Sequence, residues 1–280
     1  MNKKTIADYY DYTIPFYRFF WHKNAESYAL HYGFWEKDTK NLEEALLNTN
    51  RFLAKKAQIK PGDLVLDAGC GIGGSAIWLA KNLGANVVGI TISKKQVDKA
   101  KELAIKNTVS DFVKFYALDY LKTKFADSTF DIVWAIESVC HADDKKDFLE
   151  EAYRLLKNGG RLIIADGFLK RNPRNDEERR IIKNFCEGLA LPNLASTAEF
   201  TNLIEEVGFR KIKSWNKTRN VLPSSKRLYN LCRLGHPLAW VGEKFHLNSS
   251  VLTKNNLAGM AQYEALRNGL GAYMVFYGEK

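Results

Sequence analysis

The stretch Val65-Leu66-Asp67-Ala68-Gly69-Cys70-Gly71-Ile72-Gly73-Gly74-Ser75 decides the fold of this chain. An apolar run ends in an acid, glycines follow, and a helical pattern begins. This order predicts a buried strand that turns into a helix through a loop without bulky side chains. Glycine lets another molecule approach the backbone, and the N–H groups at the start of a helix attract negative charge. The loop is therefore expected to cradle a cofactor, the alternative being a tight turn without a ligand.

The spacing Gly69-x-Gly71-x-x-Gly74 matches the fingerprint of dinucleotide-binding proteins, so a nicotinamide cofactor is one alternative. Two features count against it. Asp67 precedes the first glycine, where a carboxylate would repel a pyrophosphate but attract an ammonium group. The second expected strand, within residues 86–93, lacks the acid that usually holds the ribose. A cofactor with an amino-acid end and a sulfonium suits this loop better.

With these residues the chain resembles the class I S-adenosylmethionine (SAM) methyltransferases, whose first motif runs acid-x-Gly-x-Gly-x-Gly. The resemblance implies SAM as the cofactor and S-adenosylhomocysteine as its product. It also implies a doubly wound α/β fold, in which a seven-stranded Rossmann-like sheet has an antiparallel last strand and carries helical cap insertions.

Regular alternation of short apolar runs with helical patterns supports a parallel sheet covered by helices. Lys157-Asn158-Gly159-Gly160 is expected to end the last helix of this series, because glycine often follows a helix. We expect strands at 64–68, 86–92, 113–118, 130–136 and 160–166, and helices at 74–83, 94–107 and 144–156. Beyond this series, two more helices are expected at 181–191 and 197–207, the second capped by Ser196 or Thr197.

The segment ahead of the first strand is rich in aromatic residues. They recur at three- and four-residue steps from Tyr9 to Phe20, which is typical of a helix. His31-Tyr32-Gly33-Phe34-Trp35 then crowds four rings around one glycine, and ring faces attract cations. The expected plan is a helical lid (1–40), a SAM-binding core (41–167), cap helices with a sixth strand (168–218), a helical acceptor-binding insertion (219–269) and the final strand of the core sheet (270–280).

The candidate site follows from where the strands end, because ligands of such sheets bind beyond the carboxyl ends of the strands. Each of the first four expected strands ends in polar residues or glycines, and His31 to Trp35 adds rings from the lid. The expected cofactor contacts are Tyr32, Asp67, Gly69, Cys70, Gly71, Gly73, Thr91, Ile92, Gln96, Asp119, Tyr120 and Glu137.

Two motifs narrow the resemblance. Thr91-x-Ser-x-x-Gln96 is similar to a motif of the tocopherol and sterol C-methyltransferases and the cyclopropane fatty acid synthases, which implies that Thr91, Ile92 and Gln96 contact the cofactor. Glu137-Ser-Val-Cys-His-Ala resembles the sterol methyltransferase segment. Cyclopropane synthases instead carry a Glu before the His, where it holds a bicarbonate. Because Cys140 stands at that position here, we do not expect cyclopropanation.

The chemistry requires little from the protein, because SAM already carries an activated methyl group. The enzyme has to align the acceptor with the methyl carbon and the sulfur, and to exclude water. A base is needed only if the acceptor must lose a proton. His141 is the first candidate, since imidazole titrates near neutral pH, and Glu137 is either its partner or a cofactor contact. Tyr32, Trp35 and His141 are expected to contact the acceptor, and no metal is expected.

The acceptor is expected to be small and apolar. Aromatic residues near the N-terminus and apolar residues in 219–269 predict a pocket for an isoprenoid, quinone, sterol-like or other lipid-like molecule. One alternative is a polar amine of the glycine or sarcosine type, held by Arg227 or Arg233 through its carboxylate. A phosphorylated metabolite, RNA and a non-catalytic SAM-binding module are further alternatives, although the sequence carries no appended RNA-binding module.

Charge and cysteine usage add expectations about the setting of the protein. The formal net charge of +10 is typical of contact with an anionic membrane or a phosphorylated ligand, and equally of lysines on solvated helix faces. Four scattered cysteines without a C-x-x-C pair favour a reduced, cytoplasmic setting. No apolar run approaches the length of a membrane span. Nucleic acid is not expected as a partner, and the sequence does not predict the oligomeric state.

Overall fold

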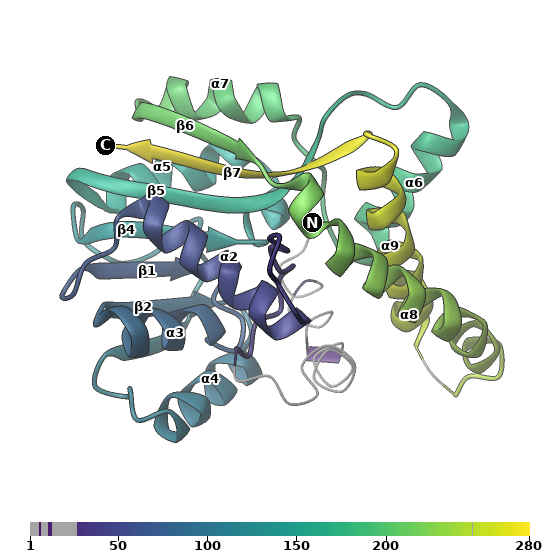
Figure 1. Ribbon diagram of the computed structural model, residues 1–280, viewed down its shortest axis with the longest axis horizontal. Coiled ribbons are helices and arrows are strands. Elements are labelled where there is room, and N and C mark those ends of the chain that lie inside the picture. The colour runs from purple at the N-terminus through teal and green to yellow at the C-terminus, as the bar shows by residue number, and fades with distance from the viewer. Residues whose placement is uncertain (1–5, 7–10, 13–26, 248) are drawn as a thin grey trace.

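One mixed sheet of seven strands organises the part of the chain that the structure describes, in the order β3-β2-β1-β4-β5-β7-β6 (Figure 1). The structure is a computed structural model and describes residues 6, 11–12, 27–247 and 249–280. β7 runs antiparallel to both of its neighbours, and the other pairs are parallel, which confirms the predicted fold class. The strands are β1 (Leu64–Ala68), β2 (Asn86–Thr91), β3 (Val113–Ala117), β4 (Phe130–Ile136), β5 (Leu156–Leu169), β6 (Arg210–Asn216) and β7 (Gly271–Glu279).

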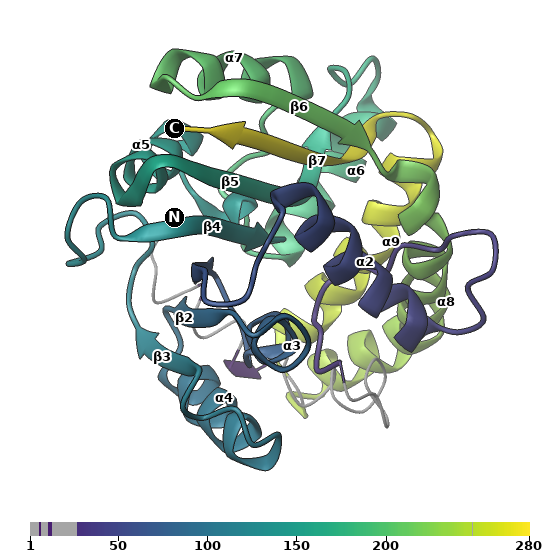
Figure 2. The same ribbon diagram turned by 60° about the vertical axis from the view of Figure 1, so that its left-hand side comes forward.

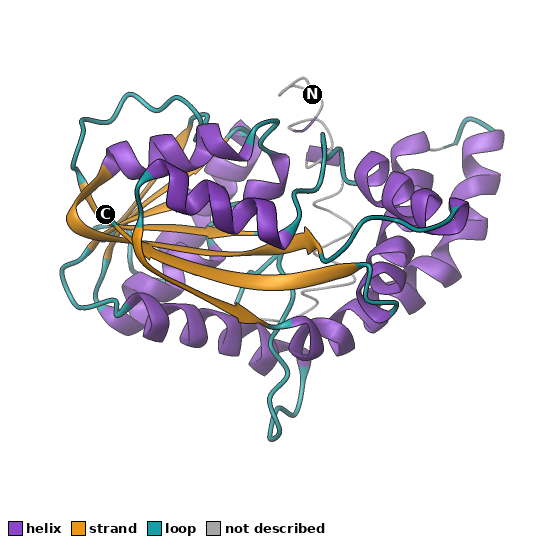
Figure 3. Ribbon diagram, turned by 90° about the horizontal axis from the view of Figure 1, so that it is seen from above, coloured by secondary structure: helices purple, strands orange, loops and turns teal. Residues whose placement is uncertain are grey.

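Helices cover both faces of this sheet (Figure 3). α2 (Leu42–Ala57), α3 (Gly74–Leu83) and α4 (Lys94–Lys106) contribute to one apolar core, and α5 (Lys145–Leu155) and α7 (Thr197–Val207) contribute to the other. Neighbouring residues of a strand point to opposite faces, so Val65 of β1 joins the first core and Leu66 joins the second. Both are almost fully buried, as expected for a parallel strand that is covered on both faces.

Three further helices form a cap beyond the end of the sheet to which β1 and β4 point (Figures 1 and 2). They are α6 (Asp176–Gly188), α8 (Thr218–Lys244) and α9 (Ser250–Arg267), and α9 packs against both of the others. The short 3-10 helix η1 (Val139–His141) follows β4 at the same end. The carboxyl ends of the parallel strands therefore face the cap. In the described residues, no helix is both long enough and apolar enough to cross a membrane.

Several predicted elements and one predicted cap agree closely with the structure. The strands at 64–68 and 130–136 and the helices at 74–83 and 197–207 have the predicted bounds. Ser196 caps α7 as expected, because its hydroxyl accepts a hydrogen bond from the N–H of Glu199 while the Glu199 carboxylate accepts one from the N–H of Ser196. Local sequence signals were therefore sufficient for these elements.

Two predicted helix boundaries were wrong. Residues 157–160 do not end a helix, because α5 already ends at Leu155 and this stretch belongs to β5. It forms a bulge, since Leu156 pairs with Phe130 but Arg161 pairs with Ile132. α6 begins at Asp176 rather than at residue 181, because the Asn175 side chain accepts a hydrogen bond from Glu178 and caps the helix earlier.

The predicted helical lid is wrong for residues 27–40. They form turns and irregular chain, and their backbone hydrogen bonds go to other elements. The N–H of Phe34 donates to the carbonyl of Ala45 (2.8 Å), and that of Trp35 donates to Asn220 of α8 (2.9 Å). Most aromatic residues on which the helical spacing rested lie outside the described residues: Tyr9, Phe16, Phe19 and Phe20.

Candidate active site

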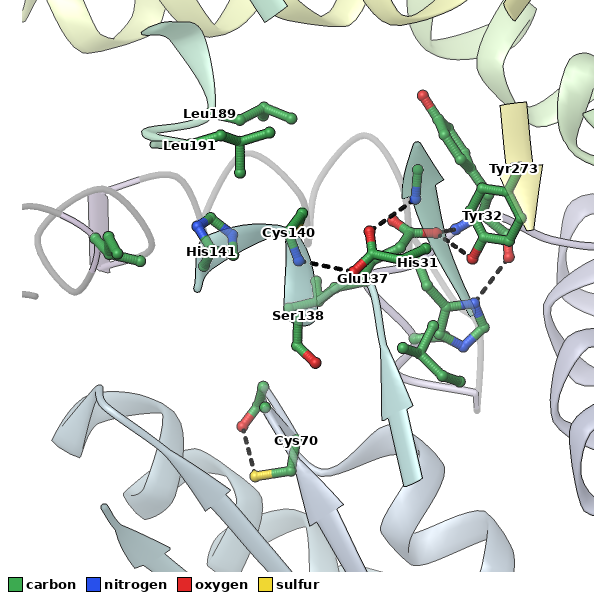
Figure 4. A pocket seen from close by; sticks show the side chains of 18 of the residues that line it. His31, Tyr32, Cys70, Glu137, Ser138, Cys140, His141, Leu189, Leu191 and Tyr273 are labelled. Atoms are coloured by element: carbon green, nitrogen blue, oxygen red, sulfur yellow. Dashed lines mark hydrogen bonds between the residues drawn. The ribbon is translucent and has the colours of Figure 1, made fainter. Parts of the chain in front are cut away.

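A cavity lies between the carboxyl ends of the parallel strands and the cap helices, and its lining comes from segments far apart in the sequence. Residues 28–32, the strand ends, α6, α8 and α9 all contribute to it (Figure 4). The cavity brings together twelve of the predicted site residues: Tyr32, Asp67, Gly69, Cys70, Gly71, Thr91, Ile92, Gln96, Asp119, Tyr120, Glu137 and His141.

Two predicted site residues are not among the lining residues. Gly73 is the N-cap of α3, and a Cβ atom there would come within 2.7 Å of the Phe115 ring, so its role is to let helix and sheet pack closely. The indole of Trp35 donates a hydrogen bond to the hydroxyl of Ser224 on α8 (2.9 Å). This contact joins the N-terminal segment to the cap.

Asp67 is the second-last residue of β1, and its carboxylate is buried. Its Oδ2 has no hydrogen bond among the described residues, while a backbone hydrogen bond at Ala76 engages the carboxylate. Burial raises the pKa of Asp67 to about 7. A buried carboxylate oxygen without a hydrogen bond lowers the stability of the fold. Its presence therefore indicates that a ligand supplies the missing hydrogen-bond donor. An ammonium group in the cavity would supply both the hydrogen bond and the opposite charge.

The glycine loop after Asp67 is held open by close packing. Gly69 has φ 94°, and a Cβ atom at this position would lie 2.4 Å from the Cβ atom of Ser138. The Ser138 hydroxyl donates to the carbonyl of Ala68 (2.6 Å), and the N–H groups of Gly69 and Cys70 both donate to the carbonyl of Ile90 (2.9 Å each). Only glycine fits at position 69, where no side chain separates the backbone from the cavity.

Residues after β2 and β3 form the next part of the wall. The Thr91 hydroxyl donates to the amide oxygen of Gln96 (2.5 Å), and both side chains are buried. Because the amide oxygen of Gln96 is already engaged, its NH₂ group is the part that could hydrogen-bond to a ribose. The Tyr120 hydroxyl donates to the carbonyl of Ser138 (2.8 Å), and the Asp119 carboxylate accepts from the N–H of Leu121 (3.0 Å). These bonds fix the side chains predicted to surround a nucleoside.

Glu137 stands at the centre of the cavity wall, where four segments meet (Figure 4). Its carboxylate accepts hydrogen bonds from the N–H of Tyr32 (2.8 Å) and the hydroxyl of Tyr273 on β7 (2.9 Å). The Tyr32 hydroxyl in turn donates to Gln262 of α9 (2.5 Å). Burial raises the pKa of Glu137 to about 8 against the effect of these two bonds. This carboxyl group can therefore exchange a proton near neutral pH.

Asp166 of β5 holds the turn that follows Glu137. Its carboxylate accepts from the N–H groups of Cys140 (2.9 Å) and Gly167 (2.8 Å). The ammonium of Lys145 donates to the carbonyls of Cys140 (3.0 Å) and Ala142 (2.5 Å) on the same turn. η1 is thus fixed from both sides, and so are the cavity residues that it carries.

The sequence interpretation missed Asp166 and Tyr273. Asp166 could have been found, because it stands near the carboxyl end of a strand, as Asp67 does. Tyr273 could not, since it lies near the start of an antiparallel strand whose position beside β5 is set by the fold. Its hydrogen bond to Glu137 depends on that pairing.

The two histidines of the cavity are neutral at pH 7. Burial lowers the pKa of His141 to about 4, although a backbone hydrogen bond at Ala190 opposes the shift. Burial also lowers the pKa of His31 to about 4, where the Nδ1 atom lies 2.8 Å from the carbonyl of Tyr32. A neutral imidazole can accept a proton, but the low pKa values make both histidines weak bases.

The far half of the cavity is apolar. In Figure 4, Leu189 and Leu191 lie next to His141 and away from Glu137. None of the described residues that line the cavity is lysine or arginine. Arg227 and Arg233, the predicted carboxylate-binding candidates, are exposed and outside the lining. The apolar wall consists of Phe168, Phe185, Leu189, Leu191, Leu194, Leu228 and Leu266.

Residues 1–221 match the model of the mycolic acid cyclopropane synthetase family. The chain belongs to this family. It is therefore a SAM-dependent methyltransferase, which confirms the predicted enzyme class and cofactor and overturns the nicotinamide alternative. The orphaned Asp67 oxygen and the open glycine loop fit the amino-acid end of SAM.

Curated relatives and a solved structure support the assignment. The chain is 31% identical over 242 residues to the chloroplastic tocopherol O-methyltransferase of Arabidopsis thaliana, covering 79% of this chain and 67% of the relative. It is 35% identical over 214 residues to cycloartenol-C-24-methyltransferase 1 of Oryza sativa subsp. japonica, covering 76% of this chain and 60% of the relative. The cyclopropane synthase MmaA2 from Mycobacterium tuberculosis superposes with a TM-score of 0.85 at 17% identity, covering 100% of this chain and 99% of that chain, which shows the shared fold.

Proposed function

We propose that this methyltransferase acts on a small, neutral, apolar acceptor of the isoprenoid, quinone or sterol-like class. The apolar half of the cavity is the observation that carries the proposal. An apolar acceptor gains from leaving water for such a wall, at roughly 25 cal/mol per Å² of buried apolar surface. The two plant relatives, whose names specify tocopherol and cycloartenol, support the same acceptor class.

In this proposal the polar half of the cavity holds SAM. Asp67 pairs with the ammonium group, Thr91, Ile92 and Gln96 surround the ribose, and Asp119 with Tyr120 faces the adenine. Bound SAM supplies a methyl group activated by its positively charged sulfur. The residues of the chain then have to place the acceptor in line with that group and keep water out, which the closely packed strand ends and the apolar wall both favour.

Glu137 is the better candidate for accepting a proton from the acceptor. Its pKa of about 8 is closer to neutral pH than that of His141, at about 4, so the carboxylate is the stronger base once ionised. Tyr32 and Tyr273 hold the Glu137 carboxylate in place through hydrogen bonds. We therefore assign proton transfer to Glu137 and contact with the acceptor to His141, which reverses the order expected from side-chain chemistry alone.

The polar alternatives lack a cation in the described lining. A glycine-type amine or a phosphorylated metabolite would bring a carboxylate or phosphate, which arginine or lysine normally pairs. The charged groups of the described lining are carboxyls, and Arg227 and Arg233 are exposed and outside the lining. RNA would require a basic groove, which this lining does not form. A neutral acceptor therefore fits the described cavity best.

Labelled methyl transfer tests the proposal. The purified enzyme is incubated with methyl-labelled SAM and a total cell extract, and the label is partitioned between organic solvent and water. We expect label in an organic-soluble product. Glu137→Gln should lower turnover by roughly 10²- to 10⁴-fold, while His141→Ala should mainly weaken acceptor binding.

Leu194→Gln tests the apolar wall separately from SAM binding. Leu194 is partly exposed and lies outside the proposed SAM half of the cavity. The substitution should reduce organic-soluble label while SAM affinity, measured by calorimetry, stays unchanged. Label that remains only in water would overturn the proposed acceptor class. Nuclease treatment of that fraction would then distinguish RNA from a small polar acceptor.

A further inference from the structure

The outer end of α8 carries a stripe of exposed apolar side chains. Leu234, Leu238, Val241 and Phe245 recur at three- and four-residue steps, so they share one face of the helix. Their exposed fractions are 72%, 77%, 44% and 67%, and that of Leu247, just beyond the helix, is 82%. Exposed apolar residues are normally scattered singly, so a stripe of this kind marks an interaction surface. The α8 patch is defined as these five residues together with Trp240.

Within the described part of the chain, no element covers this face of α8. The opposite face packs inward, where Cys232 and Ala239 are buried. Gly259 of α9 brings the two helices together there, because a Cβ atom at Gly259 would lie 2.4 Å from the sulfur of Cys232. In Figure 1, the end of α8 lies at the far side of the cap from the sheet. The exposed stripe is therefore available to a partner outside the fold.

Positive charge borders the α8 patch. Arg233, Trp240 and Lys244 lie in an adjacent helical row, and the Lys244 ammonium is 5.4 Å from the centre of the Trp240 ring. Residues 226–254 contain five lysines and arginines against one acid, Glu243. An apolar stripe flanked by tryptophan and by basic side chains is typical of a helix that lies on a lipid surface, with the rings and charges at the level of the headgroups.

We propose that the α8 patch docks this enzyme onto the surface of an anionic phospholipid bilayer. Apolar side chains enter the boundary of the acyl chains, and Arg233 and Lys244 pair with anionic headgroups. A second copy of the chain fits the patch less well. Each copy carries the same positive charge around the patch, so two patches would repel each other, whereas anionic lipid attracts them.

The position of the α8 patch relative to the cavity gives the docking a consequence. Leu228 lines the cavity on the same helix, six residues before Leu234, which is about 9 Å along the axis. A docked enzyme would hold its cavity close to the layer in which apolar molecules dissolve. This consequence rests on the proposed acceptor class, but the docking itself does not.

Vesicle flotation tests the docking without any acceptor. The full chain is mixed with vesicles of phosphatidylglycerol and phosphatidylcholine, or of phosphatidylcholine alone. We expect binding to the anionic vesicles only, weakened at 0.5 M salt because salt screens the charges. The double variants Leu238→Ser/Phe245→Ser and Arg233→Glu/Lys244→Glu should each lower the affinity by roughly tenfold or more.

Ile105→Ser is the matched control, since Ile105 is an exposed apolar residue (68%) on α4, outside the α8 patch. It should bind vesicles as the wild type does. SAM titration of every variant reports whether it is folded, and none of these positions lies in the cavity lining. Two results would overturn the docking: wild-type protein that does not bind anionic vesicles, and double variants that both bind them as tightly as the wild type does. So would a dimer, measured by light scattering, that the apolar variant dissociates.

Discussion

At the residue scale, the site depends on carboxyl groups whose pKa values are raised by burial. Asp67, Glu137 and Asp166 all have raised pKa values because each is buried. They differ in their partners. Asp166 accepts two backbone hydrogen bonds and holds a turn, whereas Asp67 keeps one oxygen without a partner among the described residues. Burial alone thus does not make a carboxylate a ligand-binding group, and the unused oxygen distinguishes Asp67.

The raised pKa of Asp67 predicts that SAM affinity depends on pH. Below pH 7 the Asp67 carboxyl is mostly protonated, while the α-amino group of SAM, with a pKa of roughly 7.7, stays charged. Pairing requires the carboxylate, so binding must release a proton there. Affinity should therefore rise by up to about tenfold per pH unit from pH 5.5 to 7 and then level off.

Calorimetry in buffers of different ionisation enthalpy measures this proton release. Asp67→Asn should release fewer protons at pH 6 and should bind SAM roughly ten- to a hundredfold more weakly at pH 7.5, since a hydrogen bond to a charged group contributes about 1.5–3 kcal/mol. An unchanged number of released protons in the variant would show that Asp67 does not pair with the ammonium group.

At the element scale, the cap depends on close contact between α8 and α9. Both helices also bind the N-terminal segment, because the Tyr32 hydroxyl hydrogen-bonds to Ser225 of α8 (3.3 Å) and to Gln262 of α9 (2.5 Å). Gly259 permits the close approach, since even one methyl group there would meet the sulfur of Cys232. Gly235 of α8 lies in ordinary surroundings, where a Cβ atom would be 3.8 Å from Asn256. The two glycines therefore offer a comparison of like substitutions.

Replacing each glycine by alanine should have different effects on the free energy of unfolding. Both substitutions gain about 1 kcal/mol from helix propensity. Gly259→Ala also has to displace Cys232, and overpacking of this kind costs about 1–3 kcal/mol. Urea denaturation should therefore find Gly259→Ala less stable than Gly235→Ala by about that amount. Equal stabilities would mean that the α8–α9 contact relaxes without cost.

At the scale of the whole molecule, the cavity is assembled from nearly every part of the described chain. β1, β2, β4, β5 and β7 bring their ends to it, and residues 28–32 and the cap close it. A ligand in the cavity therefore contacts segments that separate on unfolding. SAM is expected to stabilise the folded state as a whole, since it binds the assembled site and not the unfolded chain.

Thermal unfolding measures this stabilisation. At a SAM concentration 100 times its Kd, the free energy of unfolding should rise by about 2.7 kcal/mol. For a chain of this size, that corresponds to an increase in Tm of roughly 5–10 °C. NADH at the same concentration is the control and should leave Tm unchanged. A shift with NADH as large as that with SAM would contradict the cofactor assignment.

The sequence by itself determined the sheet, the glycine loop and the residues at the strand ends. These features follow from local signals: apolar periodicity, glycine at turns, and the rule that parallel strands end on the same edge. Eleven predicted residues met in one cavity for that reason, and Tyr32 joined them from the segment ahead of β1. Helix ends were less certain, as the bulge in β5 shows, because strand pairing decided where α5 stops.

Only the tertiary structure decided which carboxylate keeps an unused oxygen, which base has the useful pKa and where α8 is left uncovered. Glu137 depends on Tyr273 from β7, and the low pKa of His141 depends on burial by the cap. Burial and hydrogen bonding arise between segments distant in the sequence, so no local pattern contains them. The sequence was sufficient to identify the candidate site residues, but the role of each one depends on the groups it packs against.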